Sequence, residues 1–187
     1  MVHGFLDTGS DFGMLKSRLE ARGVTCFVPR LRPNDGRFGL EHLALNLQRQ
    51  IDGKFGSQQP ISLVGFSMGG LVSRHYLQNL GGAKRCENLI TVSSPHHGTK
   101  GACLYASVGA QEMRPGSRFL SNLARTQNRL GKMPLTSYRT RLDLIILPST
   151  SSIWNRAVNL EFPVLLHPLM LRSKAVVADI ERRLLER

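Results

Sequence analysis

The sequence lacks any run of about 18 or more apolar residues, the length that a transmembrane helix needs. Its first residues also lack the basic and apolar regions of a signal peptide, so the chain as it stands is expected in the cytoplasm. Cysteine is scarce, with 3 widely spaced residues and no Cys-x-x-Cys pair. We therefore expect neither a zinc site nor a redox motif, and we interpret the thiols as buried rather than paired.

Acidic residues are also few, because 13 Asp and Glu stand against 25 Lys and Arg, which gives a net charge of +12. Nucleic-acid-binding chains usually gather basic residues on one face and add stacking aromatics. Here aromatics make up 6% and the basic residues are dispersed, so we predict no nucleic-acid partner. Residues 98–141 carry a local basic excess with Glu112 as the single acid. This excess is either a solvated surface or a basic rim around an active-site entrance that would favour an anionic lipid surface.

The apolar pattern alternates between short strands and helices along all 187 residues, which favours one domain spanning 1–187. Strands are expected over 24–28, 61–66, 89–92, 134–140 and 159–162, and helices over 10–22, 40–51, 68–80, 117–130 and 172–187. This alternation predicts an α/β fold with a mostly parallel sheet and helices on both faces. Residues 98–133 contain several glycines and no strand pattern, so we interpret them as a cap or lid insertion.

The most informative motif is Gly65-Phe66-Ser67-Met68-Gly69, which lies between an expected strand and an expected helix. Gly-x-Ser-x-Gly in this position is a nucleophile elbow, in which the serine occupies a sharp, strained turn. The helix that follows points its N-terminus, with free N–H groups and a partial positive charge, at the serine. Ser67 is therefore the predicted nucleophile.

A serine hydroxyl needs a base, and the base needs a third group that orients it. His75 lies eight residues along the helix, about 12 Å from the elbow, and is out of reach. His96 and His97 follow a strand and are expected to line the pocket, but they precede most candidate acids. His167 follows the last strand and precedes the last helix, so it is the predicted base.

The candidate acids between Ser67 and His167 are Glu87, Glu112, Asp143 and Glu161. Sites in parallel sheets form at the carboxyl ends of strands, whereas Glu87 precedes its strand and Glu161 is expected early in another. Glu112 lies in the insertion. Asp143 follows the expected strand 134–140 and is the predicted acid.

An oxyanion hole requires two backbone donors. We expect the N–H of Met68, directly after the nucleophile, and the N–H of Phe5 in the loop His3-Gly4-Phe5.

At these residues the chain resembles the α/β-hydrolase superfamily and, within it, the small bacterial lipases and esterases. The resemblance rests on the His3-Gly4-Phe5 loop, the elbow around Ser67, the segment Ser94-Pro95-His96-His97-Gly98-Thr99, Asp143 and His167. It implies a serine hydrolase of carboxylic esters with apolar acyl groups that needs no metal or organic cofactor. The family also places a buried strand before the His-Gly pair, where this chain has only Met1 and Val2, so the first strand is expected to be truncated.

The sequence is compatible with three hypotheses about the function. The first is a lipase or esterase that forms an acyl-enzyme on Ser67. The second is a thioesterase or acyltransferase of the same fold. The third, favoured by the short first strand, is a non-catalytic binding module, because a fold does not fix a function.

Overall fold

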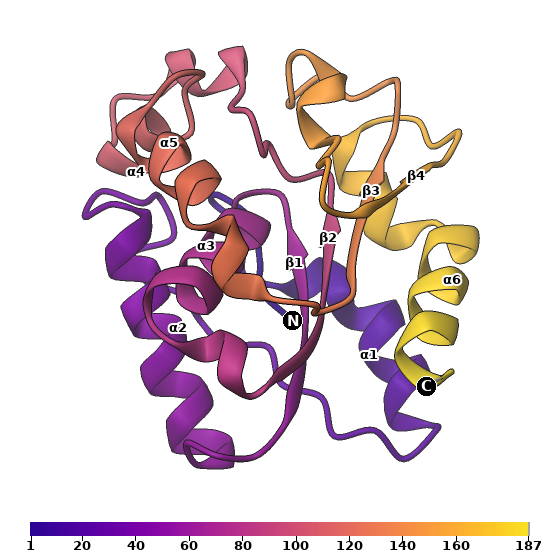
Figure 1. The fold of residues 1–187 in the computed structure, drawn as a ribbon. Coiled ribbons are helices and arrows are strands. Elements are labelled where there is room, and N and C mark those ends of the chain that lie inside the picture. The colour runs from indigo at the N-terminus through magenta and orange to yellow at the C-terminus, as the bar shows by residue number, and fades with distance from the viewer. Residues whose placement is uncertain (187) are drawn as a thin grey trace.

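The computed structural model describes residues 1–186, and a parallel sheet forms its centre (Figure 1). The strands β1 (Ile61–Phe66), β2 (Cys86–Val92), β3 (Leu135–Arg139) and β4 (Val158–Glu161) lie side by side in chain order, and every pair is parallel. Val2 continues the sheet beyond β1 through an isolated parallel bridge to Gly65. The parallel sheet that the sequence predicts is confirmed.

Each strand connects to the next through helical segments, as parallel pairing requires. The α-helices are α1 (Gly13–Glu20), α2 (Leu40–Phe55), α3 (Met68–Asn79), α4 (Val108–Glu112), α5 (Arg118–Arg125) and α6 (Lys174–Leu185). Short 3-10 helices are η1 (Ser10–Phe12), η2 (Gly82–Lys84), η3 (Lys100–Leu104), η4 (Gln127–Leu130), η5 (Ser149–Ser152) and η6 (His167–Arg172).

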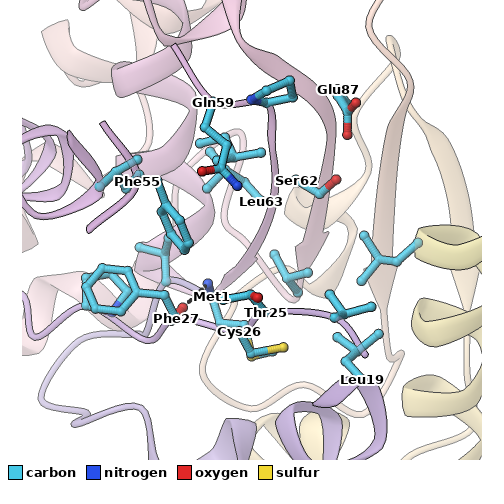
Figure 2. Close-up of a pocket in the computed structure, with 18 of the residues that line it drawn as sticks. Met1, Leu19, Thr25, Cys26, Phe27, Phe55, Gln59, Ser62, Leu63 and Glu87 are labelled. Atoms are coloured by element: carbon cyan, nitrogen blue, oxygen red, sulfur yellow. Dashed lines mark hydrogen bonds between the residues drawn. The ribbon is translucent and has the colours of Figure 1, made fainter. Parts of the chain in front are cut away.

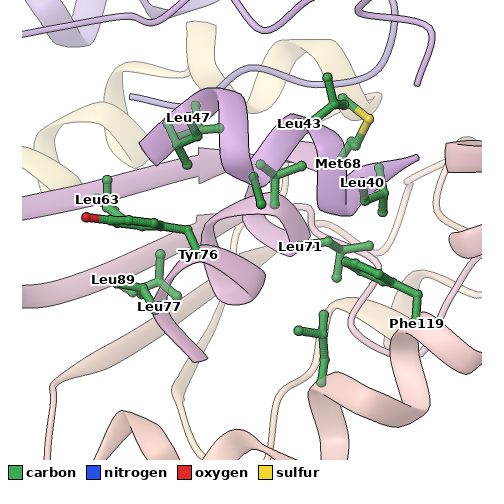
Figure 3. Packing of buried hydrophobic residues seen from close by; sticks show 14 of the residues in the cluster. Leu40, Leu43, Leu47, Leu63, Met68, Leu71, Tyr76, Leu77, Leu89 and Phe119 are labelled. Atoms are coloured by element: carbon green, nitrogen blue, oxygen red, sulfur yellow. The ribbon is translucent and has the colours of Figure 1, made fainter. Parts of the chain in front are cut away.

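Helices cover both faces of the sheet, and the central strands β1 and β2 bury apolar residues on both faces. Leu63 of β1 packs into a cluster with α2 and α3, whereas its neighbour Val64 packs into a second cluster with α1 and α6. Figure 3 shows the first cluster, in which Leu43 and Leu47 of α2 lie near the residues of α3. The alternation of side chains along β1 therefore divides the core into two layers.

The structure corrects four details of the sequence prediction. Residues 24–28 do not form a strand. Glu161 is the last residue of β4 rather than an early one. The expected helix 117–130 is divided into α5 and η4. Finally, Cys86 is buried as expected, but Cys26 is only half-buried and Cys103 is exposed, and all three thiols are free.

Residues 98–133 fold into η3, α4, α5 and η4, with no strand within this described stretch. The segment is tied to the rest of the domain, because Gly109 N–H donates to the Gly36 carbonyl at 2.8 Å. The Glu112 carboxylate accepts a 2.5 Å hydrogen bond from the N–H of Leu40, the first residue of α2. A cap role for the segment stays a prediction.

Across residues 1–186, no helix combines the length and the apolar character needed to cross a membrane.

Candidate active site

Ser67 lies at the sharp turn between β1 and α3, with φ 53° and ψ −123°. A non-glycine residue rarely adopts a positive φ, and such strain persists only where the surroundings enforce it. Two backbone hydrogen bonds do so, from Ser67 N–H to the Val92 carbonyl at 2.8 Å and from Gly70 N–H to the Ser67 carbonyl at 3.1 Å. Ser67 is 8% exposed, so the turn holds the hydroxyl in a largely enclosed place.

The glycines on either side of Ser67 are required by close backbone contacts. A Cβ on Gly69 would lie 2.0 Å from the Val2 carbonyl oxygen, and a Cβ on Gly65 would lie 2.6 Å from the Gly70 Cα. Neither distance can be relieved by moving a flexible side chain. The elbow glycines thus allow α3 to pack directly against the backbone of residues 2 and 3.

The structure brings the predicted acid and base together. Asp143, in the loop after β3, has its Oδ2 2.8 Å from Nδ1 of His167, which is the first residue of η6. Both side chains are buried, and the His167 ring lies 4.8 Å from the ring of Phe66, the residue before Ser67. His167 therefore packs beside the elbow, with Nδ1 turned to Asp143.

The Asp143 carboxylate is held in its ionised form. Burial alone would raise its pKa, but the hydrogen bond and charge of His167, together with the N–H groups of Ile146 and Ile145, leave the pKa below its usual value. Those two N–H groups donate to Oδ1 at 2.9 and 3.0 Å. Oδ1 of Asp143 therefore holds the loop after β3 through two backbone hydrogen bonds, while Oδ2 orients His167.

The remaining acids have other partners or positions. Glu161 forms ion pairs with Arg139 and Arg141, and Glu112 binds the start of α2. Glu87 is the second residue of β2, at the opposite end from the elbow. The prediction that Glu161 lies early in its strand is wrong, because Glu161 is the last residue of β4.

The other histidines after Ser67 are engaged away from the elbow. His75 stacks on Phe119 of α5 with ring centroids 5.4 Å apart. His96 is buried, with Nε2 3.1 Å from the Thr91 hydroxyl and Nδ1 3.2 Å from the Arg74 guanidinium. His97 Nε2 lies 3.1 Å from the Ile153 carbonyl oxygen. His96, His97 and Arg74 line a cavity of about 260 Å³ beside α5.

A buried histidine predicts that the protein is less stable in acid. Burial, followed by the charges of Arg74 and His97, lowers the pKa of His96 well below 6.5. Around and below pH 6.5 the unfolded chain therefore binds more protons than the folded one, so stability rises with pH. The thermal midpoint should fall by a few degrees from about pH 7.5 to about pH 5. His96→Gln should flatten the part of this slope below pH 6.5, and a midpoint that stays constant on acidification would contradict the assignment.

The predicted oxyanion donors flank Ser67. Met68 is the first residue of α3, where N–H groups lack partners within the helix. Phe5 follows Gly4, where a Cβ would lie 3.2 Å from the Ser67 Cβ, so this loop passes directly beside the nucleophile. The loop and the helix start therefore converge on the same side chain.

Two side chains hold the Phe5 loop: Asp7, which was not predicted from the sequence, and His3, which was predicted only as part of the loop. The Asp7 carboxylate accepts hydrogen bonds from Thr8 N–H at 2.6 Å and Gly9 N–H at 2.9 Å, with a longer one from Gly4 N–H at 3.4 Å. His3 Nε2 accepts from Leu31 N–H at 3.0 Å, which ties the loop to the segment before α2. Asp7 could have been found from the sequence Asp7-Thr8-Gly9, because an aspartate in such a segment often accepts hydrogen bonds from the backbone of its own turn.

Exposed leucines are chain neighbours of three predicted site residues, Phe5, Asp143 and His167, and we call these leucines the apolar rim. They are Leu6 beside Phe5, Leu142 and Leu144 beside Asp143, and Leu165 and Leu166 beside His167, all at least 46% exposed. Large exposed apolar residues beside a site can offer contact to apolar ligands or partners. Within the described residues, no group of three or more His, Cys, Asp or Glu side chains could hold a metal ion.

Comparison with known proteins identifies the family. The family model described as palmitoyl protein thioesterase matches residues 1–137, which include the elbow and the Phe5 loop. The chain belongs to the palmitoyl protein thioesterase family. The match ends before Asp143 and His167, so the family model covers the nucleophile but not the other two predicted residues. No curated protein matches the chain.

Solved structures similar to this member of the palmitoyl protein thioesterase family have the α/β-hydrolase fold. The mature lipase BlEst2 of Bacillus licheniformis superposes with a TM-score of 0.78 at 18% identity, covering 98% of this chain and 89% of that one. The lin2722 gene product of Listeria innocua gives 0.73 at 13% identity, covering 100% and 92%. The ydeN gene product of B. subtilis gives 0.70 at 16% identity, covering 100% and 97%. The predicted fold is confirmed, and the family match supports the predicted superfamily.

Proposed function

We propose that the protein hydrolyses carboxylic esters or thioesters through an acyl-enzyme on Ser67. The observation that carries the proposal is the 2.8 Å contact between Asp143 and His167 beside a serine held at φ 53°. A nucleophile on a strained turn, a base packed against that turn and an acid that orients the base are the parts that acyl transfer requires. Membership of a thioesterase family supports the same class of reaction.

In the first half-reaction, the Ser67 hydroxyl oxygen attacks the acyl carbon and its proton passes to His167. Asp143 accepts a hydrogen bond from Nδ1–H, which leaves Nε2 as the atom that takes the proton. The charge that develops on the carbonyl oxygen is stabilised by the N–H groups of Phe5 and Met68. Losing one such donor typically costs about 3 kcal/mol of transition-state stabilisation.

The tetrahedral intermediate then collapses. The bond between the acyl carbon and the leaving oxygen or sulfur breaks, and His167 returns the proton to the leaving alcohol or thiol. Water attacks the acyl-enzyme with His167 as the base, releasing the carboxylic acid and restoring Ser67. No step needs a metal or organic cofactor.

The apolar rim favours a substrate with an apolar acyl chain. Its exposed leucines neighbour Phe5, Asp143 and His167 along the chain, so we expect an acyl chain that leaves the site to meet apolar surface. In this proposal, residues 98–133 act as a cap over the entrance to the Ser67 site. An anionic lipid surface stays a secondary prediction, motivated by the basic excess over 98–141.

A thioester substrate is the second candidate, and the family name favours it specifically. A thiolate leaves more easily than an alkoxide, so a thioesterase depends less on protonation of the leaving group by His167. Acyl transfer to an alcohol or amine would use the same acyl-enzyme with a different acceptor in place of water.

The test is covalent labelling with a fluorophosphonate that carries an alkyl chain, followed by mass spectrometry of the peptides. We expect one adduct, on Ser67, together with turnover of p-nitrophenyl octanoate and of the matched octanoyl thioester. Heat-denatured protein is the control for non-specific labelling. An unlabelled native protein without turnover of either substrate would reject hydrolysis and favour the non-catalytic module.

A further inference from the structure

The cavity of about 260 Å³ beside α5 is separate from the Ser67 site, and we call it the Arg74 cavity. None of the predicted site residues lines it, and Arg74 lies seven residues along α3 from Ser67, which is about 10 Å. Figure 2 shows a different cavity, beside β1, with Met1 and Phe27 at one end and Gln59 at the other. All the residues that line the Arg74 cavity fall within 74–155, so the middle of the chain forms its walls.

The Arg74 cavity has a buried floor and an exposed mouth. Arg74, His96, Trp154 and Leu120 line it and are each at most 6% exposed. The other lining residues are half-buried or exposed, and they are His97, Gly116, Ser121, Ala124, Gln127 and Asn155. A ligand that enters between these residues therefore meets the Arg74 guanidinium at the bottom.

Arg74 is a buried cation that forms no ion pair within residues 1–186. Its guanidinium donates to Gln78 Oε1 at 3.1 Å, to His96 Nδ1 at 3.2 Å and to the Leu123 carbonyl at 3.2 Å, all of which are neutral acceptors. Burial lowers the pKa of Arg74 from 12.5 to about 9, so the group stays charged at neutral pH without an anion to compensate it. A guanidinium has five N–H groups, so these bonds leave donors for a further acceptor.

The chain around the Arg74 cavity supplies no carboxylate that could neutralise the guanidinium. Residues 113–142 and 144–160, which include α5 and the segment after η5, contain no acid. Glu112 and Asp143, which border these stretches, are engaged with the start of α2 and with His167. The basic excess of this part of the chain therefore favours an anion from solution.

The walls of the Arg74 cavity favour an organic anion over an inorganic one. The Arg74 Cζ lies 4.3 Å from the ring centroid of Trp154, so the indole covers one face of the guanidinium. The His96 ring lies 4.8 Å from the same indole. The edge of the guanidinium is what a ligand meets, and a carboxylate fits that edge because it accepts two parallel N–H bonds. Leu120 and Ala124 offer apolar contact to the rest of such a ligand.

We propose that the Arg74 cavity binds a small organic carboxylate. Its oxygens accept hydrogen bonds from the Arg74 guanidinium, and its short alkyl chain lies between Trp154 and Leu120. The carboxylate replaces the anionic partner that the chain does not provide, and the apolar walls select an aliphatic acid. Binding in this cavity is independent of the hydrolytic reaction proposed for Ser67.

The test uses sodium hexanoate as the ligand and the fluorescence of Trp154 as the signal. Trp154 is the single tryptophan of the chain and lines the cavity, so its emission reports on binding there. At constant ionic strength, we expect a saturable change in emission with half-saturation at about 1 mM, matched by calorimetry. Hexanamide, which lacks the charge, and sulfate, which lacks the alkyl chain, should each bind at least about tenfold more weakly. Equal binding of either one would overturn the proposal.

A matched pair of variants tests the role of the guanidinium. Arg74→Met keeps an unbranched stem without the charge and should weaken hexanoate binding at least about tenfold. Arg125→Met removes the same charge from an exposed position outside the cavity and should leave binding unchanged. Equal weakening in both variants would show that net charge, rather than the cavity, attracts the ligand, and would overturn the proposal.

A second pair of variants tests the location without altering a buried residue. Ala124→Phe fills the mouth from an exposed position on α5 and should abolish binding, whereas Asn128→Phe, exposed and outside the cavity, should not. Ser67→Ala should bind hexanoate as the wild type does. Binding that survives in Ala124→Phe, or that is lost in Ser67→Ala, would place the ligand elsewhere and overturn the proposal.

Discussion

Ser67→Ala is expected to lower kcat for ester and thioester hydrolysis by about five to six orders of magnitude. Alanine removes the oxygen that forms the acyl-enzyme. His167 and Asp143 act through that hydroxyl, so they cannot compensate for its removal. What remains is stabilisation of the oxyanion and binding of the substrate, which support only slow attack by water. Kinetics with p-nitrophenyl octanoate, together with loss of fluorophosphonate labelling, measure the effect.

The fold of this variant should be intact. The hydroxyl of Ser67 is not needed to hold the turn, because the backbone bonds to Val92 and Gly70 remain and alanine meets the same strain at φ 53°. The thermal midpoint should therefore change little, and Ser57→Ala, at an exposed position after α2, should retain full activity. A Ser67→Ala protein that keeps more than about one hundredth of wild-type kcat would show that another group is the nucleophile.

The elbow and the parallel sheet were predictable because they depend on local residue patterns. Gly65 and Gly69 are required by backbone contacts that any sequence must satisfy at such a turn, and the apolar runs of β1 and β2 are continuous because both of their faces are covered. The pairing of Asp143 with His167 followed from chain order and from the rule that parallel strands present their carboxyl ends together.

Other features depend on tertiary partners that a single sequence does not reveal. Residues 24–28 have the composition of a strand, but they do not enter the sheet, and the Phe27 carbonyl accepts a hydrogen bond from the Met1 nitrogen. Glu161 ends β4 because the strand begins one residue earlier than its apolar pattern suggests and stops before Phe162. The exposure of the leucines in the apolar rim also depends on the folded chain, because apolar residues are ordinarily expected in the core.

Asp143→Asn is expected to lower kcat by about four orders of magnitude while preserving the fold. The asparagine oxygen can still accept the N–H groups of Ile145 and Ile146, which fixes the amide nitrogen towards His167. That nitrogen donates, so Nδ1 of His167 must accept and its proton moves to Nε2. The base then carries a proton on the atom that should receive one from Ser67. Steady-state kinetics at pH 7 measure the loss.

Two further variants separate orientation from stability. Asp143→Ala also removes the acceptor for Ile145 and Ile146, so it should lose both activity and several degrees of thermal stability, whereas Asp143→Asn should lose activity with a much smaller thermal change. Asp35→Asn, at a partly exposed carboxylate that pairs with Arg37, should keep wild-type kcat. If Asp143→Asn lowers kcat less than about tenfold, then Asp143 does not set the tautomer of His167, and its bond to the imidazole serves only to close the loop after β3.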